Sequence, residues 1–179
     1  ANEVLKVKRF ESGMVVDPLT INPENTLQQA ISIKEKNQIS GIPVVEKASN
    51  KLVGILTNRD IRFATNKDQK VKTLMTKDNL VTVSANISMQ EAERLLHKNR
   101  IEKLIVVDKN FSCIGLITVK DIEKARRYPN ASKDTMGRLI VGAAVGVGED
   151  QGLERTKFLF NSGVDLVVID TAHGHSKML

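Results

Sequence analysis

Residues 52–61 read LVGILTNRDI, and residues 113–122 read CIGLITVKDI. Each stretch is an apolar run with one glycine, followed by a Thr-x-x-Asp pattern that is typical of a strand leading into a helix. The second stretch repeats the first after 61 residues. A chain that contains this unit twice is predicted to fold as two similar lobes that face each other.

The similarity between the two copies extends well beyond these stretches. Equivalent residues are separated by 61 or 62 positions, so one residue has been gained in an early turn and one lost in a later turn. Surface loops tolerate such changes. The equivalent pairs include Met14 and Met75, Thr20 and Thr82, Ala30 and Ala92, Val44 and Val106, and Gly54 and Gly115.

Each copy is predicted to run strand, helix, strand, strand, helix. The first helices are expected to start at two capping boxes, in which a hydroxyl accepts from an early helical N–H and the Gln or Glu side chain bonds back. Those boxes are Thr26-x-x-Gln29 and Ser88-x-x-Glu91. Buried strands are expected at residues 42–45 and 104–107, and the last helices after Thr57 and Thr118.

A single copy, of about 60 residues, buries too little apolar surface to be stable alone. The two copies are therefore expected to pack on each other as a pseudo-twofold pair. Pro43 removes one backbone donor from its strand and predicts an open strand margin. In the second copy, Glu102-Lys103-Leu104 is read as the replacement for Gly41-Ile42-Pro43.

The composition narrows the class of protein. Of the 179 residues 41% are apolar, but they form no run long enough to span a membrane, and charged residues interrupt any signal-peptide core at the start. One cysteine, Cys113, excludes an internal disulfide framework and fits a reducing, cytoplasmic compartment. It lies in an apolar strand and is interpreted as a buried small hydrophobe.

The net charge of +6 suggests affinity for anions. The charge alone does not distinguish three explanations: binding of small phosphorylated ligands, binding of nucleic acid, or a basic surface that is only solvated. Nucleic acid is disfavoured, because the chain has five Phe, one Tyr and no Trp with which to stack bases.

The double pattern resembles the tandem CBS module, or Bateman domain, over about residues 14–126. That resemblance implies regulatory binding of adenine or guanine nucleotides, as ATP or GTP, in clefts between the copies. The aspartates could accept both hydroxyls of a ribose, and the threonines stand at helix starts that favour phosphate. The alternative, that Thr-x-x-Asp is only a helix cap, stays open. The candidate nucleotide-binding residues are Gly41, Ile42, Pro43, Thr57, Arg59, Asp60, Thr118, Lys120 and Asp121.

The segment after Tyr128-Pro129 changes character. A strand is expected at residues 139–147, a helix at 153–162 with Gly163 as its stop, and a buried strand at 164–169. This order is typical of a parallel sheet. The polar stretch 170–176, DTAHGHS, then follows a strand end, where α/β barrels place their chemistry.

The segments before and after the duplicated module resemble the IMP dehydrogenase family, and the sequence of residues 171–175 is closer to its bacterial members than to its eukaryotic ones. The resemblance spans essentially all 179 residues. It implies an α/β fold in which a tandem CBS pair interrupts a (β/α)8 TIM barrel. The residues that carry it are 8–14 (KRFESGM), 128–131 (YPNA), 133–134, 137–139, 141–146 (VGAAVG) and 170–176.

The resemblance implies a domain order of barrel-derived helix and linker (1–13), first CBS copy (14–72), second CBS copy (73–128) and barrel segment (129–179). It implies that this chain is a central piece of a longer enzyme, here called the parent enzyme. The cofactor of the parent enzyme would be NAD, contacted by Asp170, Thr171 and His173. The resemblance also implies that the full-length enzyme forms tetramers or octamers. This chain alone is expected to dimerise through its CBS pair, and the lack of a long apolar run predicts no membrane association. No catalytic cysteine loop is recognised, so the chain alone is expected to be inactive.

Other readings have less support. A free-standing CBS nucleotide sensor would not need the stretch 170–176. His173 and His175 have no third ligand and do not predict a metal site. Gly146, Gly148 and Gly152 do not form a dinucleotide-binding loop, because Gln151 stands where that pattern needs glycine.

Overall fold

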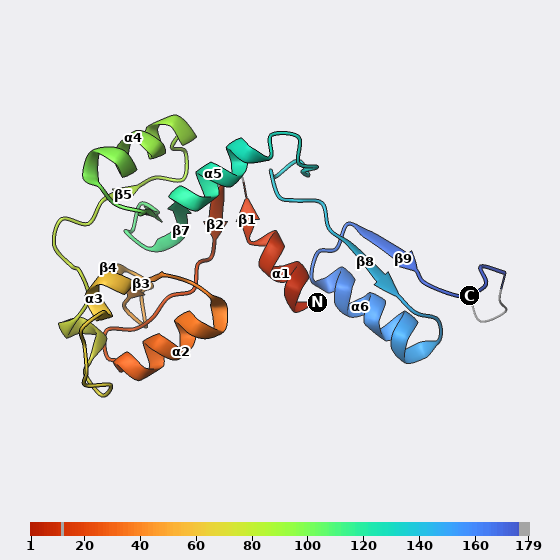
Figure 1. Ribbon diagram of the computed structural model, residues 1–179, viewed down its shortest axis with the longest axis horizontal. Helices are drawn as coiled ribbons and strands as arrows, with labels where there is room; N and C mark the ends of the chain where they lie inside the picture. Colours follow the sequence, from red (N-terminus) through yellow and green to blue (C-terminus); the bar gives the residue numbers. More distant parts are fainter. Residues whose placement is uncertain (12, 176–179) are drawn as a thin grey trace. The chain divides into compact units, whose positions relative to one another are not determined.

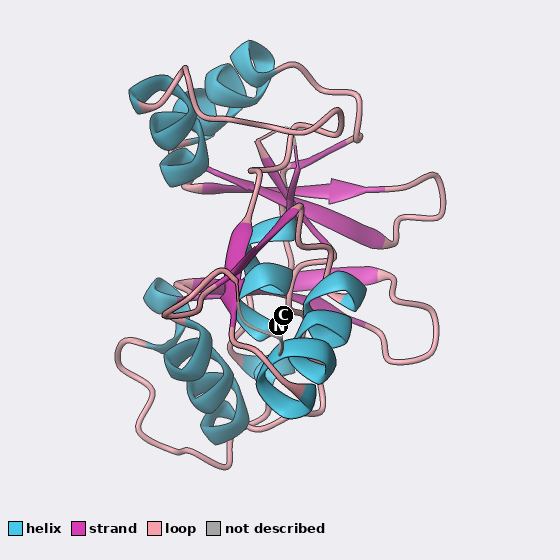
Figure 2. Cartoon of the chain, turned by 90° about the vertical axis from the view of Figure 1, so that its right-hand side faces the viewer, coloured by secondary structure: helices cyan, strands magenta, loops and turns pink. Residues whose placement is uncertain are grey.

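Short helices separate single strands or pairs of strands in the computed structural model, which describes residues 1–11 and 13–175 (Figures 1 and 2). The chain divides into two compact units, residues 14–124 and residues 1–13 with 125–179. The helices are α1 (Asn2–Lys8), α2 (Leu27–Asn37), α3 (Asn58–Ile61), the 3-10 turn η1 (Val71–Thr73), α4 (Met89–Asn99), α5 (Val119–Arg127), the π-helix η2 (Glu149–Glu154) and α6 (Arg155–Asn161). The strands are β1 (Phe10–Glu11), β2 (Met14–Val16), β3 (Gly41–Val45), β4 (Leu52–Thr57), β5 (Thr82–Val83), β6 (Lys103–Val107), β7 (Cys113–Thr118), β8 (Gly142–Val145) and β9 (Leu166–Ile169).

The duplication is visible in the strand pairing of residues 14–124. In the first copy β3 pairs antiparallel with β4, and in the second copy β6 pairs antiparallel with β7. Both pairs carry a register shift at the same place, between Val44 and Val45 and between Val106 and Val107. The predicted elements at residues 42–45 and 104–107 are therefore confirmed as strands.

The two copies meet through reciprocal contacts. Lys51 and Ser112, which are equivalent residues, form an antiparallel bridge with each other. The N–H of Leu52 donates to the Phe111 carbonyl at 2.9 Å, and the N–H of Cys113 donates to the Asn50 carbonyl at 3.1 Å. Because these two bonds join the same pair of positions in opposite directions, the copies are related as by a pseudo-twofold axis.

The leading segment of each copy crosses to the other copy. Met14–Val16 pairs with β7 of the second copy, and Thr76 forms the equivalent antiparallel bridge with Ile55 of the first. A Cβ added to Gly115 would clash with the Met14 side chain, and one added to Gly54 would lie 2.7 Å from the Met75 sulfur. The single glycine in each repeated strand therefore makes room for the methionine of the other copy.

Backbone conformation repeats with the same spacing. All six non-glycine residues with positive φ in the described part of the chain fall into three equivalent pairs. Such conformations are uncommon, so their recurrence is independent support for the duplication. The pairs are Asp17 and Asn79, Gln38 and Arg100, and Asn50 and Phe111.

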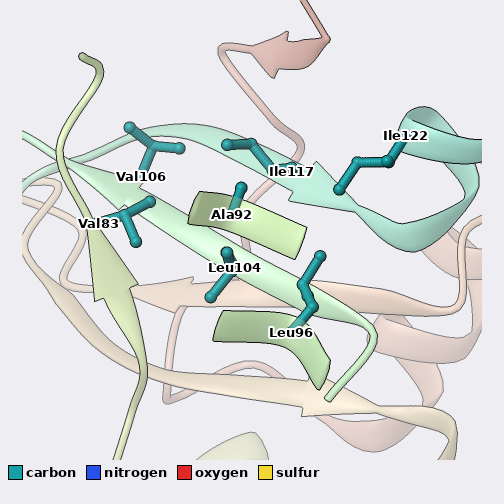
Figure 3. Packing of buried hydrophobic residues seen from close by; sticks show 7 residues of the cluster. All are labelled: Val83, Ala92, Leu96, Leu104, Val106, Ile117 and Ile122. Carbon is teal, nitrogen blue, oxygen red and sulfur yellow. The ribbon is translucent and has the colours of Figure 1, made fainter. Parts of the chain in front are cut away.

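Each copy has its own apolar core, and a third cluster joins them. In the second copy, Ala92 and Leu96 of α4 pack against the strand residues Leu104, Val106 and Ile117 (Figure 3). The equivalent core of the first copy contains Ala30, Ile42, Val44 and Leu56. The joining cluster contains Val45, Leu52, Ile105, Cys113 and Leu116.

Three details of the copies differ from the prediction. The first strand of the first copy is reduced to one parallel bridge, between Ile21 and Val44, because Pro43 has no N–H to extend the ladder. Instead of lying at an open margin, Pro43 is fully buried and its carbonyl accepts from the Ile21 N–H. The pairing partners show that Lys103, not Glu102, is equivalent to Gly41, since Gly41 faces Thr57 and Lys103 faces Thr118.

The predicted helix starts are mostly confirmed. Thr26 and Gln29 form the full reciprocal capping box. Ser88 accepts from the Glu91 N–H at 3.2 Å, but the Glu91 carboxylate forms an ion pair with Arg94. The second box is therefore only half formed, because a nearby guanidinium offers the carboxylate a charged partner.

The other unit contains a strand-helix-strand element. β8 and β9 are parallel, with Val145 opposite Ile169, and α6 packs against β8 (Figure 1). The predicted strand at 139–147 is shorter than expected, and the predicted helix at 153–162 is preceded by a π-helix. Gly163, at φ 82°, ends α6 as predicted.

The expectation of a buried strand at 164–169 is wrong for this chain. Val164 is buried, but Leu166, Val168 and Ile169 are each more than half exposed. A parallel sheet is normally covered on both faces. Only β8 pairs with β9 among the described residues, so the apolar side chains of β9 lack the layers that would cover them.

Candidate functional site

The Thr-x-x-Asp pattern of the first copy forms a compact hydrogen-bonded turn. The N–H and the hydroxyl of Thr57 both donate to Oδ2 of Asp60, each at 2.6 Å. The turn starts α3, which is only four residues long. The capping interpretation is therefore satisfied here, and it leaves the aspartate held in one position.

The second copy forms the same turn. The N–H and hydroxyl of Thr118 donate to Oδ2 of Asp121, at 3.2 and 2.7 Å. The first copy has one further bond, because the Thr76 hydroxyl donates to Oδ1 of Asp60 at 2.9 Å. The residue equivalent to Thr76 is Val15, whose side chain has no donor. The two aspartates thus differ in how much of their accepting capacity is already used.

A cleft of about 660 Å³ lies between the two copies. It brings together three of the predicted residues, Thr57, Arg59 and Asp60, from the first copy. The facing wall comes from the second copy and includes Glu102, Lys103 and Ile105, on and just before β6. The cleft combines apolar walls with charged groups, as ligand sites commonly do.

The other predicted nucleotide-binding residues do not line this cleft. Gly41, Ile42 and Pro43 are buried in β3. Thr118 and Asp121 are half-buried and Lys120 is exposed, at the equivalent position in the second copy. These three residues are the pseudo-twofold equivalents of Thr57, Arg59 and Asp60. They therefore mark the position at which a second, equivalent site is expected.

Several lining residues were missed by the sequence analysis. Thr76 and Arg100 line the cleft although neither belongs to the repeated Thr-x-x-Asp stretch, and Arg62 follows it. Lys34 was also missed. It does not line the cleft but is buried on α2, and it was not recognised because a single lysine in a helix normally points to solvent. Comparing the copies at a separation of 62 residues would have found it, since its equivalent is Leu96.

The candidate cofactor residues follow β9. The Asp170 N–H donates to the Val145 carbonyl at 2.8 Å, which fixes the chain at the carboxyl end of the parallel strands. Asp170 and His173 are exposed, and Thr171 is half-buried. The rest of the motif ends at Ser176, which lies outside the described residues.

A buried ionic cluster stabilises the same unit. Lys8 of α1, whose side chain is 6% exposed, contacts Asp134 at 3.3 Å and Asp165 at 2.5 Å. Burial opposes ionisation of Asp134, but hydrogen bonds from Arg138, Lys8 and Met136 hold its pKa at about 2. The hydrogen bond from Lys8 also lowers the pKa of Asp165. The cluster ties α1 to the segments that lead to β8 and β9.

Other candidate chemistries find no support in the described residues. Cys113 is buried as predicted, and burial raises the pKa of its thiol to about 11, so it stays protonated. In residues 1–11 and 13–175, no three His, Cys, Asp or Glu side chains gather closely enough to hold a metal ion. None of the helices in this part of the chain has the length and apolar content needed to cross a bilayer.

Comparison with known proteins gives a consistent family. The family model described as the IMP dehydrogenase / GMP reductase domain matches residues 1–179. Inosine-5'-monophosphate dehydrogenase from Rhizobium tropici is 57% identical over 178 residues, which are 99% of this chain and 35% of that protein. The enzyme of the same name from Aquifex aeolicus is 52% identical over 179 residues, covering 99% of this chain and 36% of that protein. This chain therefore spans about a third of the length of these curated relatives.

Solved structures agree. GMP reductase from Trypanosoma brucei in complex with guanosine 5'-triphosphate matches with a TM-score of 0.83 and 35% identity, over 98% of this chain and 42% of that one. The same enzyme in complex with guanosine 5'-monophosphate matches with a TM-score of 0.82 and 34% identity, over 98% and 38%. The full-length match of the family model, with more than half of the residues identical to two dehydrogenases, shows that this chain belongs to the IMP dehydrogenase / GMP reductase family.

Proposed function

We propose that this chain is the regulatory, purine-nucleotide-binding part of an IMP dehydrogenase. The parent reaction is the NAD-dependent oxidation of IMP to XMP, in guanine nucleotide synthesis. The observation that carries the proposal is the cleft between two equivalent copies, with an aspartate fixed at its wall, in a chain of this family. The duplicated unit would be a tandem CBS pair.

In the proposed complex, Asp60 and Asp121 accept hydrogen bonds from ribose hydroxyls of two nucleotides. Thr57 and Thr118 stand near the phosphates, with Arg59 and Lys120 as cationic partners. Gly41, Ile42 and Pro43 are buried in β3, so their proposed role is to support the nucleotide site from within that strand and not to touch the base. Binding of GTP and GMP by a solved relative supports purine nucleotides as the ligand class. A nucleotide that binds one arrangement of the copies better would shift the protein toward that arrangement.

In the parent enzyme, Asp170, Thr171 and His173 would contact NAD, which accepts the hydride from IMP. The position and exposure of Asp170 support this role. Asp170 is an exposed acceptor directly after β9, at the strand end where ligands of parallel sheets bind. A ribose diol is the partner that suits such a carboxylate.

The 179-residue chain alone is expected to have no dehydrogenase activity. In the described part of the unit formed by residues 1–13 and 125–179, the parallel sheet consists of β8 and β9, and two strands cannot enclose a barrel. An absorbance assay for NADH with IMP and NAD tests this expectation, and any turnover by the purified chain would contradict it. The parent is proposed to form tetramers or octamers and this piece a dimer, which light scattering can measure.

Nucleotide binding is tested by thermal shift with ATP, ADP, GTP and a guanosine polyphosphate, since a ligand of the folded state raises the melting temperature. In calorimetric titrations, Asp60→Ala and Asp121→Ala should each lose roughly 1.5–3 kcal/mol of binding, the contribution of a charge-assisted hydrogen bond. Asp78→Ala, at an exposed position, is the control. Unchanged affinity in both aspartate variants would reject the assignment.

Two alternatives are weaker. A free-standing nucleotide sensor does not account for a family match that includes residues 125–179. A GMP reductase is favoured by the solved structures, but these are 34–35% identical, whereas the curated dehydrogenases are 52–57% identical. Assaying the parent enzyme with IMP and with GMP would separate the two activities.

A further inference from the structure

Lys34 is the buried cation of the first copy. Its side chain lies on the inner face of α2 with the residue 6% exposed, and Nζ is the buried side-chain polar atom without a hydrogen-bond partner in the described residues. Burying an unpaired ammonium is costly. The fold does not require a charge there, because the equivalent position in the second copy is the buried Leu96.

A second lysine lies nearby with little exposure. The Lys103 side chain is 10% exposed, and its Cε lies 3.0 Å from the point where Gly41 would carry a Cβ. Its carboxylate neighbour, Glu102, is 3.6 Å away and its side chain is 81% exposed, so it compensates Lys103 weakly. Burial and the charge of Lys103 lower the pKa of Lys34, while Asp60 opposes this effect.

Asp60 is poorly placed to neutralise both lysines. Its two oxygens already accept from Thr57 and Thr76. Asp60 and Lys103 both line the cleft between the copies. That cleft carries four cationic side chains, Arg59, Arg62, Arg100 and Lys103, against the two carboxylates Asp60 and Glu102. The cleft lining therefore carries an excess of positive charge, and Lys34, whose charge interacts with those of Lys103 and Asp60, adds to it.

The excess is confined to one side of the pseudo-twofold axis. The residues equivalent to Lys34 and Lys103 are Leu96 and Gly41, neither of which can carry a charge. The Asp121 side of the module therefore lacks the two lysines that stand on the Asp60 side.

We propose that Lys34 and Lys103 form an anion site at the Asp60 cleft that takes the phosphate end of a bound nucleotide. This inference rests on the proposed nucleotide-binding function and deepens it. The Asp60 cleft is then selective for polyphosphorylated nucleotides, whereas the Asp121 side discriminates less by phosphate number. The entering phosphates supply the counter-charge that the two lysines lack.

The test uses the 179-residue chain and the variant Lys34→Leu, which copies Leu96. The probes are ATP, adenosine and inorganic triphosphate, titrated by calorimetry. ATP and triphosphate are expected to bind Lys34→Leu about tenfold more weakly, while adenosine binds both proteins equally. Without ligand, Lys34→Leu is expected to melt at a higher temperature. A purely structural role for Lys34 would not produce these opposite effects.

The control is Lys36→Leu, at an exposed position on the same helix, which should change neither quantity. Lys103→Gly, which copies Gly41, is a second variant and should also lose triphosphate binding. If Lys34→Leu and Lys103→Gly bind ATP as the wild type does, the anion site is overturned and the nucleotide proposal stands. If the wild type binds neither ATP nor adenosine nor triphosphate, both proposals fall.

Discussion

Thr76 and Val15 occupy equivalent positions beside the two aspartates and give them different chemistry. The Thr76 hydroxyl holds one oxygen of Asp60, whereas Val15 has nothing to donate to Asp121. A ribose that enters the Asp60 cleft must compete with Thr76. Because this hydrogen bond is exposed to solvent, it contributes about 1 kcal/mol, less than a buried bond to a carboxylate, and this is enough to make the two proposed ribose contacts unequal.

Replacing Thr76 by valine should therefore tighten nucleotide binding in the Asp60 cleft. Because the ribose no longer displaces a hydroxyl, we expect about a fivefold gain in affinity, measured by calorimetry with ATP. The reciprocal variant, Val15→Thr, should weaken the other site by a similar factor. Equal affinities in wild type and Thr76→Val would show that the ribose does not use Oδ1 of Asp60.

The glycines of the repeated strands make a second prediction at the residue scale. A Cβ on Gly115 would lie 2.9 Å from Met14 Cγ and 3.2 Å from the Val106 Cβ. Gly115→Ala should destabilise the protein by about 1–3 kcal/mol through overpacking, measured by urea denaturation. Truncating Met14 to alanine in the same chain should recover part of this loss.

Gly174→Ala is the matched control, because nothing lies within 4 Å of the added Cβ. It should leave the free energy of unfolding within about 0.5 kcal/mol of the wild type. A Gly115→Ala variant as stable as this control would mean that the crossing of Met14 to β7 is not a close contact in solution.

At the scale of elements, the internal repeat made the strands of the duplicated module predictable from the sequence. Two copies of strand, glycine and Thr-x-x-Asp predicted β3, β4, β6 and β7 with nearly correct bounds. What the pattern could not predict were the partners across the copies. The crossing of Met14–Val16 to β7 depends on contacts between residues about 100 positions apart. Local strand propensity does not predict which distant residues pair.

The candidate site was predictable to a similar degree. Thr57, Arg59 and Asp60 were found because they belong to the repeat. Lys34 was missed because a single lysine within an apolar helix pattern looks like a solvated residue until its burial is known. The exposure of β9 was missed because the strand sequence suits a buried sheet, whatever covers it.

The ionic cluster of Lys8 makes a prediction about the element α1. Lys8→Met removes the cation shared by Asp134 and Asp165 and leaves two carboxylates close together, so the unit containing α1, β8 and β9 should melt at a lower temperature. Lys6→Met, at an exposed position of the same helix, should have little effect. Equal melting of both variants would show that the cluster is not stabilising.

The same cluster gives a pH dependence with a definite sign. The pKa of Asp134 is about 2 in the folded protein, below the value of about 4 for an unfolded chain. Its contribution is therefore present above pH 4 and is lost as the pH falls toward 2. Urea denaturation at a series of pH values should show this loss in the wild type and a smaller one in Asp134→Asn.

For the whole molecule, the distribution of exposed apolar side chains separates the two units. Of the thirteen large hydrophobic residues that are exposed in the described part of the chain, only Phe63 and Phe111 belong to residues 14–124. The other eleven belong to the unit of α1, β8, α6 and β9. Three apolar clusters lie within residues 14–124 and one lies in the other unit. Residues 14–124 thus bury nearly all of their large apolar side chains wholly or partly, whereas the other unit has one small buried cluster and leaves eleven such side chains exposed.

Residues 14–124 expressed alone should therefore fold. The pseudo-twofold contacts, the three clusters and the Asp60 cleft are all internal to this segment. We expect a cooperative thermal transition, no binding of a hydrophobic dye, and the ATP affinity of the 179-residue chain. The longer chain should bind the dye through residues such as Phe158 and Val168. If the excised segment bound the dye while the longer chain did not, the incomplete core would lie in the duplicated module and not in the parallel sheet.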